Sequence, residues 1–468
     1  MKLQFFGAVE SVTGSKHLLT TNSGLKILLD CGSFQGEKNS GHTSNLTFGF
    51  DPKEIDILIL SHAHIDHSGL IPRLVKEHFR GPIYATPATF DLCEVMLMDS
   101  AKIQENDTKY INKKREKTNL PKTEPLYTEE DVKLSLSLFK QIPYNQKITI
   151  EKDLTFFFTN AGHILGSAAV HIDYENNNQF THLSFTGDVG RPNDKILPAP
   201  EPFRQAQYII CEATYGDRLH GNAIDTIAAL EKIVVETCVE KKGKVIIPAF
   251  SLDRTQELIY ALDVLKNQNK IPSIKVFVDS PLSVKTTNIM RNNSILFNDE
   301  IKEYMNKTDG DPFIFKDITY ISDVEKSKSL NQLKEPCIII SASGMAEAGR
   351  IKHHIKNNIN DPNNTILLVG YASPYSLAGQ LKRGAAEVRI FGKLYKVKAR
   401  VDSIEGYSAH ADYEELLAYL SCQNPTLVKK IFLVHGDDDA KLNFRQLLLQ
   451  KGFKDVEIVK YKEEIDMA

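Results

Sequence analysis

The segment Ser61-His62-Ala63-His64-Ile65-Asp66-His67 decides the fold of this chain. It follows the apolar run Ile55-Asp56-Ile57-Leu58-Ile59-Leu60, which is short and rich in β-branched residues, as buried strands are. The histidine and aspartate cluster therefore lies on the loop at the end of a predicted strand. Functional residues tend to collect at this position in α/β proteins.

The cluster has the composition of a metal site. One ion cannot use four side chains from so short a segment, and alternate residues of a tight loop point in different directions. His62 and His64 can therefore bind one ion while Asp66 and His67 face another. Imidazole and carboxylate ligands together suit zinc, with Zn–N distances of about 2.0–2.1 Å. The alternative interpretation is a histidine-rich surface loop. That interpretation would be preferred for a lone histidine, but not for this spacing directly after a strand.

Length and composition set the limits for the whole chain. With 468 residues, the protein is expected to contain two or three domains. Its 42% hydrophobic and 25% charged residues are typical of a soluble globular protein. The formal net charge of -3 means that overall charge would not attract a polyanion. If nucleic acid is the substrate, a local basic channel and metal ions must hold its phosphates.

The cysteines and the N-terminus predict a cytoplasmic protein. No signal-peptide layout is present, and no apolar stretch reaches the length that spans a membrane. The cysteines show no CxxC pairing, so a disulfide framework or a zinc finger is not expected. Several follow strand-like apolar runs, which suits buried reduced thiols; the six are Cys31, Cys93, Cys211, Cys238, Cys337 and Cys422.

Strand-like and helix-like segments alternate along the chain and predict an α/β fold. Residues 91–115 run without proline or glycine and are predicted to form one long helix. Its basic residues are better explained as a solvated face than as a nucleic-acid patch. Prolines near 192–202 indicate a first boundary, after which strands alternate with helices, as at 223–241, in the pattern of a parallel βαβ sheet. A second boundary is expected near 384–387.

Other candidate ligands also follow predicted strands. His163 comes just after 154–159, Asp188 after 183–186, and His435 after 431–434. Each alone could be an ordinary loop or core residue, but together they complete two ligand sets. One zinc ion is predicted to bind to His62, His64, His163 and Asp188, and the second to Asp66, His67, His435 and a shared Asp188.

Two ions about 3.5–4 Å apart would make a bridging water acidic, lowering its pKa from 15.7 to roughly 7. The shared Asp188 carboxylate would hold their separation and offset part of their repulsion. Asp30, at the end of the predicted strand 26–31, is better placed to orient a histidine ligand than to bind metal itself.

These residues resemble the metallo-β-lactamase fold through His62-x-His64-x-Asp66-His67, preceded by Asp30 and followed by His163 and Asp188. Three further positions resemble the additional motifs of the β-CASP nucleases. A lone HxHxDH motif would leave many hydrolases open, but this combination is specific and covers nearly the whole chain. The three positions are Glu212 in Cys211-Glu212-Ala213-Thr214, His410 in Ser408-Ala409-His410-Ala411-Asp412, and His435 in Val434-His435-Gly436.

The resemblance implies an αββα metallo-β-lactamase sandwich interrupted by an inserted α/β β-CASP domain with a parallel sheet. The expected ranges are 1–205 for the first part, 206–386 for the insertion and 387–468 for the completion of the first domain. Compared with some relatives, we expect neither an N-terminal KH extension nor the C-terminal domain of RNase J. No obligate assembly is therefore implied, although a homodimer is compatible with the sequence.

β-CASP nucleases cleave RNA or DNA phosphodiesters. RNA-cleaving members carry histidine at the last motif, whereas DNA-processing relatives such as Artemis carry valine, so His435 favours RNA. The resemblance implies a zinc-dependent ribonuclease with two Zn²⁺ per chain that cuts single-stranded RNA internally, by a hydroxide that the two metals activate. It is similar to the endonuclease of mRNA 3′-end processing and its bacterial and archaeal relatives.

Catalytic roles follow from the same motifs. His410 is a candidate to contact the scissile phosphate or to protonate the leaving 3′ oxygen, which would leave a 5′-phosphate and a 3′-hydroxyl. Glu212 could orient His410 and raise its pKa, or it could be an ordinary strand-end carboxylate. Asp66 is expected to serve the reaction as well as to bind metal. Flanking phosphates are expected to contact Arg254, Ser280, Ser343 and the Gly344 amide in a cleft between the domains.

The sequence leaves several alternatives open. Arg254 could instead pair with Glu257, which lies one helical turn away. The enzyme could be a 5′–3′ exoribonuclease, or a hydrolase of small molecules on the same scaffold. Glu212, His410 and the long insertion argue against a small substrate. A non-catalytic RNA-binding scaffold is a third class, but such proteins lose metal ligands and this sequence retains a full set.

Overall fold

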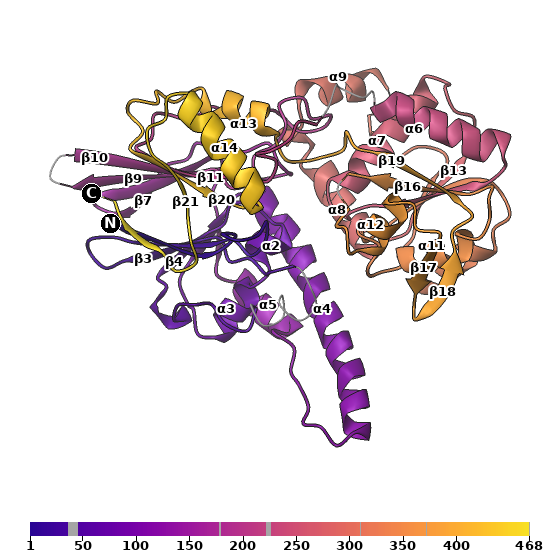
Figure 1. Cartoon of the computed structure of the whole chain (residues 1–468), viewed down its shortest axis with the longest axis horizontal. Helices are drawn as coiled ribbons and strands as arrows, with labels where there is room; N and C mark the ends of the chain where they lie inside the picture. Colours follow the sequence, from indigo (N-terminus) through magenta and orange to yellow (C-terminus); the bar gives the residue numbers. More distant parts are fainter. Residues whose placement is uncertain (36–44, 177–178, 221–225, 309, 371, 468) are drawn as a thin grey trace. The chain divides into compact units, whose positions relative to one another are not determined.

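The structure is a computed structural model that describes residues 1–35, 45–176, 179–220, 226–308, 310–370 and 372–467 (Figure 1). The chain divides into two compact units. The first consists of Met1–Leu219 together with His410–Ala468, and the second of His220–Ala409. Among the described residues, no helix is both long enough and apolar enough to cross a membrane.

The first unit contains two seven-stranded sheets. One has the order β22-β1-β2-β3-β4-β5-β6 and the other the order β21-β20-β11-β10-β9-β8-β7. The strands of the first sheet are β1 (Lys2–Gly7), β2 (Lys16–Thr20), β3 (Lys26–Leu29), β4 (Ile57–Ile59), β5 (Ile83–Ala85), β6 (Phe139–Gln141) and β22 (Glu464–Asp466). Those of the second are β7 (Ile148–Glu151), β8 (Leu154–Asn160), β9 (Ala168–Asn176), β10 (Gln179–Phe185), β11 (Tyr208–Glu212), β20 (Lys430–Val434) and β21 (Val456–Ile458).

The two sheets pack against each other through buried apolar side chains. Phe5 and Ile59 of the first sheet and Phe158 and Ile210 of the second belong to one core cluster and are fully buried. Burial on this scale is the main favourable contribution to folding. A second cluster joins the outer face of the second sheet to helices, with Phe444 of α14 among its members.

Helices cover both outer faces of the sandwich (Figure 1). α13 and α14 lie beside β11 and β20, and α3 and α5 lie on the side of β3 and β4. This four-layer αββα arrangement is the one predicted from the sequence. The helical segments are η1 (Pro52–Glu54), α2 (Ile65–Ser68), α3 (Ile71–Lys76), α4 (Pro87–Lys117), α5 (Glu129–Leu136), α13 (Tyr413–Leu420) and α14 (Asp438–Gln450).

The long helix predicted at 91–115 is confirmed as α4. Pro87 stands in its first turn, where its missing N–H costs nothing, and the Thr86 hydroxyl accepts a hydrogen bond from the Thr89 amide. None of the six cysteines, all of which are described, forms a disulfide, and five are buried. The predicted burial of several cysteines is therefore confirmed.

The second unit is built on a six-stranded sheet of order β14-β13-β15-β12-β16-β19, in which every neighbouring pair is parallel. Its strands are β12 (Lys244–Pro248), β13 (Lys275–Val278), β14 (Ile318–Tyr320), β15 (Cys337–Ser341), β16 (Thr365–Val369) and β19 (Arg400–Ile404), beside a hairpin of β17 (Glu387–Ile390) and β18 (Lys393–Lys396). The predicted parallel sheet is confirmed.

The strands of this sheet alternate with helical segments. These are α6 (Thr226–Val234), η2 (Val235–Glu240), α7 (Arg254–Asn267), α8 (Pro281–Asn292), η3 (Ser294–Leu296), α9 (Asp299–Lys307), α10 (Val324–Ser329), η4 (Leu330–Gln332), α11 (Ile351–Asn358) and α12 (Leu377–Lys382). The helix expected at 223–241 is described from Thr226 onward, and its first expected residues, 223–225, lie outside the described residues.

The limits of the two units differ from the sequence-based ranges 1–205, 206–386 and 387–468. β11, expected to open the insertion, pairs with β10 and β20 in the first unit. β17, β18 and β19, expected in the final segment, lie in the second unit, where β19 pairs with β16. A short buried strand has the same sequence signature in either sheet, so only strand pairing reveals where it belongs.

Candidate metal centre

The HxHxDH segment leaves β4 and turns into the short helix α2. Its turn is held by the Ser68 hydroxyl, which donates to the carbonyl of Ala63 at 2.9 Å and is 3.0 Å from that of His64. The backbone at Gly32 passes directly against it, because a Cβ there would lie 1.6 Å from the Asp66 carbonyl oxygen. This close approach requires glycine and fixes the two loops to each other.

Three imidazoles and one carboxylate form the first ligand group. His64 Nδ1 lies 3.2 Å from His62 Nε2 and 3.2 Å from His163 Nε2. Asp188 Oδ2 lies 3.5 Å from each of those two Nε2 atoms. His163 reaches the group from the loop after β8, and Asp188 from the loop after β10. Four potential ligand atoms thus converge on one point.

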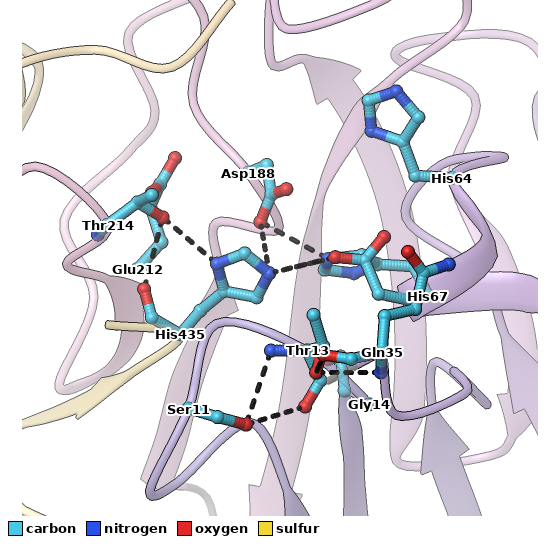
Figure 2. Close-up of polar contacts among 12 residues, drawn as sticks. Ser11, Thr13, Gly14, Gln35, His64, His67, Asp188, Glu212, Thr214 and His435 are labelled. Carbon is cyan, nitrogen blue, oxygen red and sulfur yellow. Dashed lines mark hydrogen bonds and ion pairs between the residues drawn. The ribbon is translucent and has the colours of Figure 1, made fainter. Parts of the chain in front are cut away.

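Two imidazoles and two carboxylates form the second group. His67 Nε2 lies 3.1 Å from His435 Nε2 and 3.3 Å from Asp188 Oδ1. His435 Nε2 lies 3.6 Å from Asp188 Oδ1 and 3.6 Å from Asp66 Oδ2. Figure 2 shows Asp188 directed toward the rings of His67 and His435. Its two oxygens therefore face different groups, Oδ2 the first and Oδ1 the second.

These spacings fit zinc ligands. In a tetrahedral site with Zn–N distances of about 2.0–2.1 Å, neighbouring ligand atoms stand about 3.3–3.4 Å apart. The separations given above run from 3.1 to 3.6 Å. Two facing ring nitrogens at such distances can share at most one proton. Because several nitrogen lone pairs face one another in each group, a cation satisfies them better than hydrogen bonds do. The donor sets, mixed imidazole and carboxylate, also suit zinc.

Burial and charge shift the pKa values of four of these groups toward the protonation states that bind metal. Burial lowers the pKa of His64 to about 4 and that of His62 well below its usual value. Burial alone would raise the pKa of Asp66, but a hydrogen bond and the charge of nearby histidines lower it to about 2. The pKa of Asp188 is likewise lowered, against burial, by His435, His67 and His62.

His67 behaves differently from the other imidazoles. Burial opposes its charged form, but Asp188 and Asp30 raise its pKa well above the usual value. The two carboxylates thus create a negative environment that attracts either a proton or a metal ion. Metal binding at His67 is therefore expected to release a proton.

Asp30 lies behind the ligands, as the sequence predicts for an orienting carboxylate. Its Oδ2 lies 2.6 Å from His67 Nδ1, the ring nitrogen that points away from the ligand group. Asp30 itself is fully buried and has a positive φ of 59°, so its backbone is held in a conformation that few non-glycine residues adopt.

His410 and Glu212 lie together beside the two ligand groups. Both Glu212 oxygens are 3.3 Å from His410 Nδ1, and they also accept hydrogen bonds from the amides of Val189 at 2.6 Å and Thr214 at 3.3 Å. Burial works against charge on His410, but Glu212, Asp188 and Asp66 raise its pKa to about 9. The His410 side chain is partly exposed, and its raised pKa favours the protonated form.

Glu212 also lies near possible ligand atoms. One of its oxygens lies within 4.8 Å of ligand atoms of Asp188 and His435. Its oxygens are already engaged by two backbone amides and by His410, which explains why orienting His410 suits it better than metal binding.

Two hydroxyl side chains that contact these histidines were not identified from the sequence. Ser61 Oγ lies 3.0 Å from His62 Nδ1. Thr214 Oγ1 lies 2.9 Å from His435 Nδ1, a contact drawn in Figure 2. The signal available was position alone, since Ser61 directly precedes His62. A single serine or threonine has no pattern that separates it from an ordinary loop residue.

The four candidate phosphate contacts all lie in the second unit, at the edge where its parallel strands end. Ser280 caps α8 by accepting the Ser283 amide, and Ser343 accepts the Ala348 amide at 3.4 Å. A Cβ at Gly344 would lie 2.9 Å from the ring of Phe250. The carboxyl edge of a parallel sheet is the usual ligand position in α/β folds.

Arg254 lies at the same edge, at the start of α7, but its guanidinium is buried. It pairs with Glu257 and lies 5.3 Å from the ring centre of Tyr407. The structure therefore shows the one-turn ion pair that the sequence left open as an alternative for Arg254.

Fold and metal centre together define a metal-dependent hydrolase of the metallo-β-lactamase superfamily. Family comparisons agree: residues 18–197 match the metallo-beta-lactamase superfamily domain, 255–381 the Beta-Casp domain, and 394–459 the Zn-dependent metallo-hydrolase RNA specificity domain. The chain belongs to the β-CASP family of metallo-β-lactamase nucleases, whose members include zinc-dependent RNA-processing enzymes.

Three relatives illustrate this membership. Ribonuclease TTHA0252 of Thermus thermophilus is 32% identical over 99% of this chain and 100% of its own length. Transcription termination factor FttA of Methanosarcina mazei is 28% identical over 96% of this chain and 69% of its own length. Cleavage and polyadenylation specificity factor 73 of Drosophila melanogaster is 27% identical over 97% of this chain and 62% of its own length.

Proposed function

We propose that this protein is an endoribonuclease that cuts single-stranded RNA internally and holds two zinc ions per chain. The observation that carries the proposal is the orientation of Asp188, whose two oxygens face two separate ligand groups. The match of 394–459 to an RNA specificity domain supports RNA as the substrate over a small molecule. The retained set of candidate ligands argues against a non-catalytic scaffold.

Each ion has a proposed set of ligands. His62, His64, His163 and Asp188 Oδ2 would hold one, and Asp66, His67, His435 and Asp188 Oδ1 the other. When bound, a zinc pair supplies Lewis acidity that activates water and offsets negative charge on the phosphate.

His410 is proposed to protonate the leaving oxygen. Attack by water on phosphorus forms a new P–O bond and breaks the bond to the 3′ oxygen, which needs a proton as it leaves. Because Glu212 is the strongest influence raising the pKa of His410, its ring can carry and deliver that proton. The products would carry a 5′-phosphate and a 3′-hydroxyl.

The second unit is proposed to act as the β-CASP insertion that contacts the RNA backbone. Its residues 255–381 match the Beta-Casp domain, and the edge that carries Ser343 and Gly344 has the position expected of a ligand site. We assign substrate phosphates to Ser343 and the Gly344 amide. Ser280 and Arg254 are engaged within the unit and are proposed to support this edge.

Internal cutting is tested with RNA that has no ends. We expect the protein with added zinc to open a circular, internally labelled single-stranded RNA, because an endonuclease needs no terminus. The linear form of the same sequence is the control. Degradation of the linear RNA from its 5′ end, with the circle left intact, would instead identify a 5′–3′ exoribonuclease.

The bridging role of Asp188 is tested by Asp188→Asn. This variant keeps the size of the side chain but removes the charge that faces both ligand groups. We expect bound zinc to fall from two ions per chain to one or fewer and RNA cleavage to be lost, with the far-UV circular dichroism spectrum unchanged. Full zinc content and full cleavage in this variant would contradict the proposal.

A further inference from the structure

We propose that Ser61 is a positioning residue that connects His62 to Asp30, so that one buried carboxylate orients a ligand of each zinc ion. The inference rests on the proposed zinc pair and deepens it. Asp30 touches His67 of the second group directly, and Ser61 extends its reach to His62 of the first group.

The contacts form a continuous chain of hydrogen bonds. Asp30 Oδ2 lies 2.6 Å from His67 Nδ1 and accepts a hydrogen bond from the Ser61 hydroxyl at 2.9 Å. Asp30 Oδ1 accepts the Ser61 backbone amide at 2.7 Å, which fixes the two residues relative to each other. Ser61 Oγ in turn lies 3.0 Å from His62 Nδ1.

Only one direction of donation agrees with metal binding. His62 Nε2 faces His64 and Asp188, so this nitrogen must keep its lone pair for the ion. The proton of a neutral His62 ring then sits on Nδ1 and is donated to Ser61 Oγ. Ser61, having accepted it, donates its own hydroxyl proton to Asp30. The opposite direction would place a proton on Nε2 and block the ligand position.

Water cannot easily replace this hydroxyl. Ser61, Asp30 and His62 are each 0% exposed. The backbone around Ser61 is equally constrained, because its carbonyl accepts the Ala168 amide at 2.9 Å and a Cβ on Gly187 would lie 2.9 Å from the Ser61 Cβ. Removal of the hydroxyl therefore leaves the His62 ring without its acceptor and Asp30 Oδ2 with one donor fewer.

Ser61 connects a ligand of the first group to Asp30, which two nearby hydroxyl side chains do not. Thr214 contacts His435 Nδ1 in a similar way, but its hydroxyl donates to the His435 carbonyl at 3.1 Å and so remains local. Ser15 donates to Asp30 Oδ2 at 3.3 Å, and its other hydroxyl contact is His17, not a ligand of the first group. Ser15→Ala is thus a matched control, because it removes one hydroxyl donor to Asp30 without touching a ligand of the first group.

The test measures zinc affinity of the full-length protein rather than activity. Metal-free wild type, Ser61→Ala, Ser61→Thr and Ser15→Ala are titrated with zinc against a chromophoric chelator. Mutation of a residue that hydrogen-bonds to a metal ligand typically weakens metal binding by roughly 10–100-fold. We expect Ser61→Ala to weaken one of the two zinc sites by about that factor and the other by less. Ser61→Thr, which keeps a hydroxyl, should restore most of the loss, and Ser15→Ala should not reproduce it.

The outcomes separate this inference from the proposed function. Wild type that binds fewer than two zinc ions would overturn both. Wild type with two ions, together with unchanged affinities in Ser61→Ala, would overturn the role of Ser61 alone. Equal loss in Ser61→Ala and Ser15→Ala would also overturn it, since the effect would then come from Asp30 and not from His62. If Ser61→Ala fails to fold, Ser61→Cys, with a similar volume but a weaker donor, is titrated with the same expectations.

Discussion

At the scale of single residues, the chemistry of this chain depends on which atom of each side chain is engaged. Asp188 uses one oxygen for each ligand group, and His62 and His67 present Nε2 to the groups while Nδ1 is held from behind. The sequence predicted which residues converge, because each follows a strand and strand ends meet. It could not predict Ser61 or Thr214, since a lone hydroxyl gains its role only from the fold.

The pairing of Glu212 with His410 leads to a pH prediction. Glu212→Gln removes the charge that does most to raise the pKa of His410 against burial. A nearby opposite charge moves a pKa by about 1–3 units, so the pKa of His410 should fall by that order. Because the proposed role of His410 requires its protonated form, the basic limb of the kcat profile should move to lower pH, with KM little changed.

The measurement is the cleavage rate of a defined RNA at saturating concentration from pH 6 to 10. Glu212→Asp, which keeps the charge, should retain a basic limb closer to that of the wild type. A uniform loss of rate at every pH, with no shift of the limb, would show that Glu212 supports structure rather than the proton on His410.

At the scale of elements, strands supply the rigidity and the loops after them supply the ligands. The predicted helix at 91–115 was confirmed because uninterrupted helix formers are a local signal. The unit limits differed from the predicted ranges because pairing of β11 and β19 is not local. Arg254 is a local case: the sequence left open a phosphate contact or a one-turn ion pair with Glu257, and the structure shows the ion pair.

We predict that a buried histidine in the second sheet makes this element sensitive to acid. His171 on β9 lies 2.8 Å from Thr159 Oγ1 and 2.9 Å from Ser184 Oγ, on the two neighbouring strands. Burial lowers its pKa to about 3. Below the unfolded value of about 6.5, the unfolded chain binds a proton that the folded chain does not, so stability falls as pH falls, by up to about 1.4 kcal/mol per pH unit.

His171→Gln tests whether this histidine lowers stability in acid. Glutamine can hydrogen-bond to both hydroxyl groups but does not titrate. We expect the variant to be equal to or less stable than the wild type at pH 8, and the difference to move in favour of the variant by about 1.4 kcal/mol per unit between pH 6 and 4. Urea unfolding at a series of pH values provides the measurement. A difference that stays constant with pH would exclude His171 as a source of acid sensitivity.

At the scale of the whole molecule, the first and last parts of the chain build one unit and the middle builds the other. All the proposed zinc ligands lie in the first unit, although they come from positions as far apart as His62 and His435. Bound zinc would therefore join distant parts of the chain. The folded first unit brings these ligands together, whereas the unfolded chain does not. The second unit contributes no ligand to either group among its described residues.

This division predicts that zinc stabilises one unit selectively. Calorimetric unfolding of the metal-free chain should show two transitions, because units with separate cores need not unfold together. Zinc at 100 times its dissociation constant adds about 2.7 kcal/mol per site, which should raise Tm of the first unit by roughly 5 °C per site. The transition of the second unit should stay in place. In Asp188→Asn the zinc-induced shift should shrink or disappear, and a zinc shift of equal size in both transitions would contradict a centre confined to the first unit.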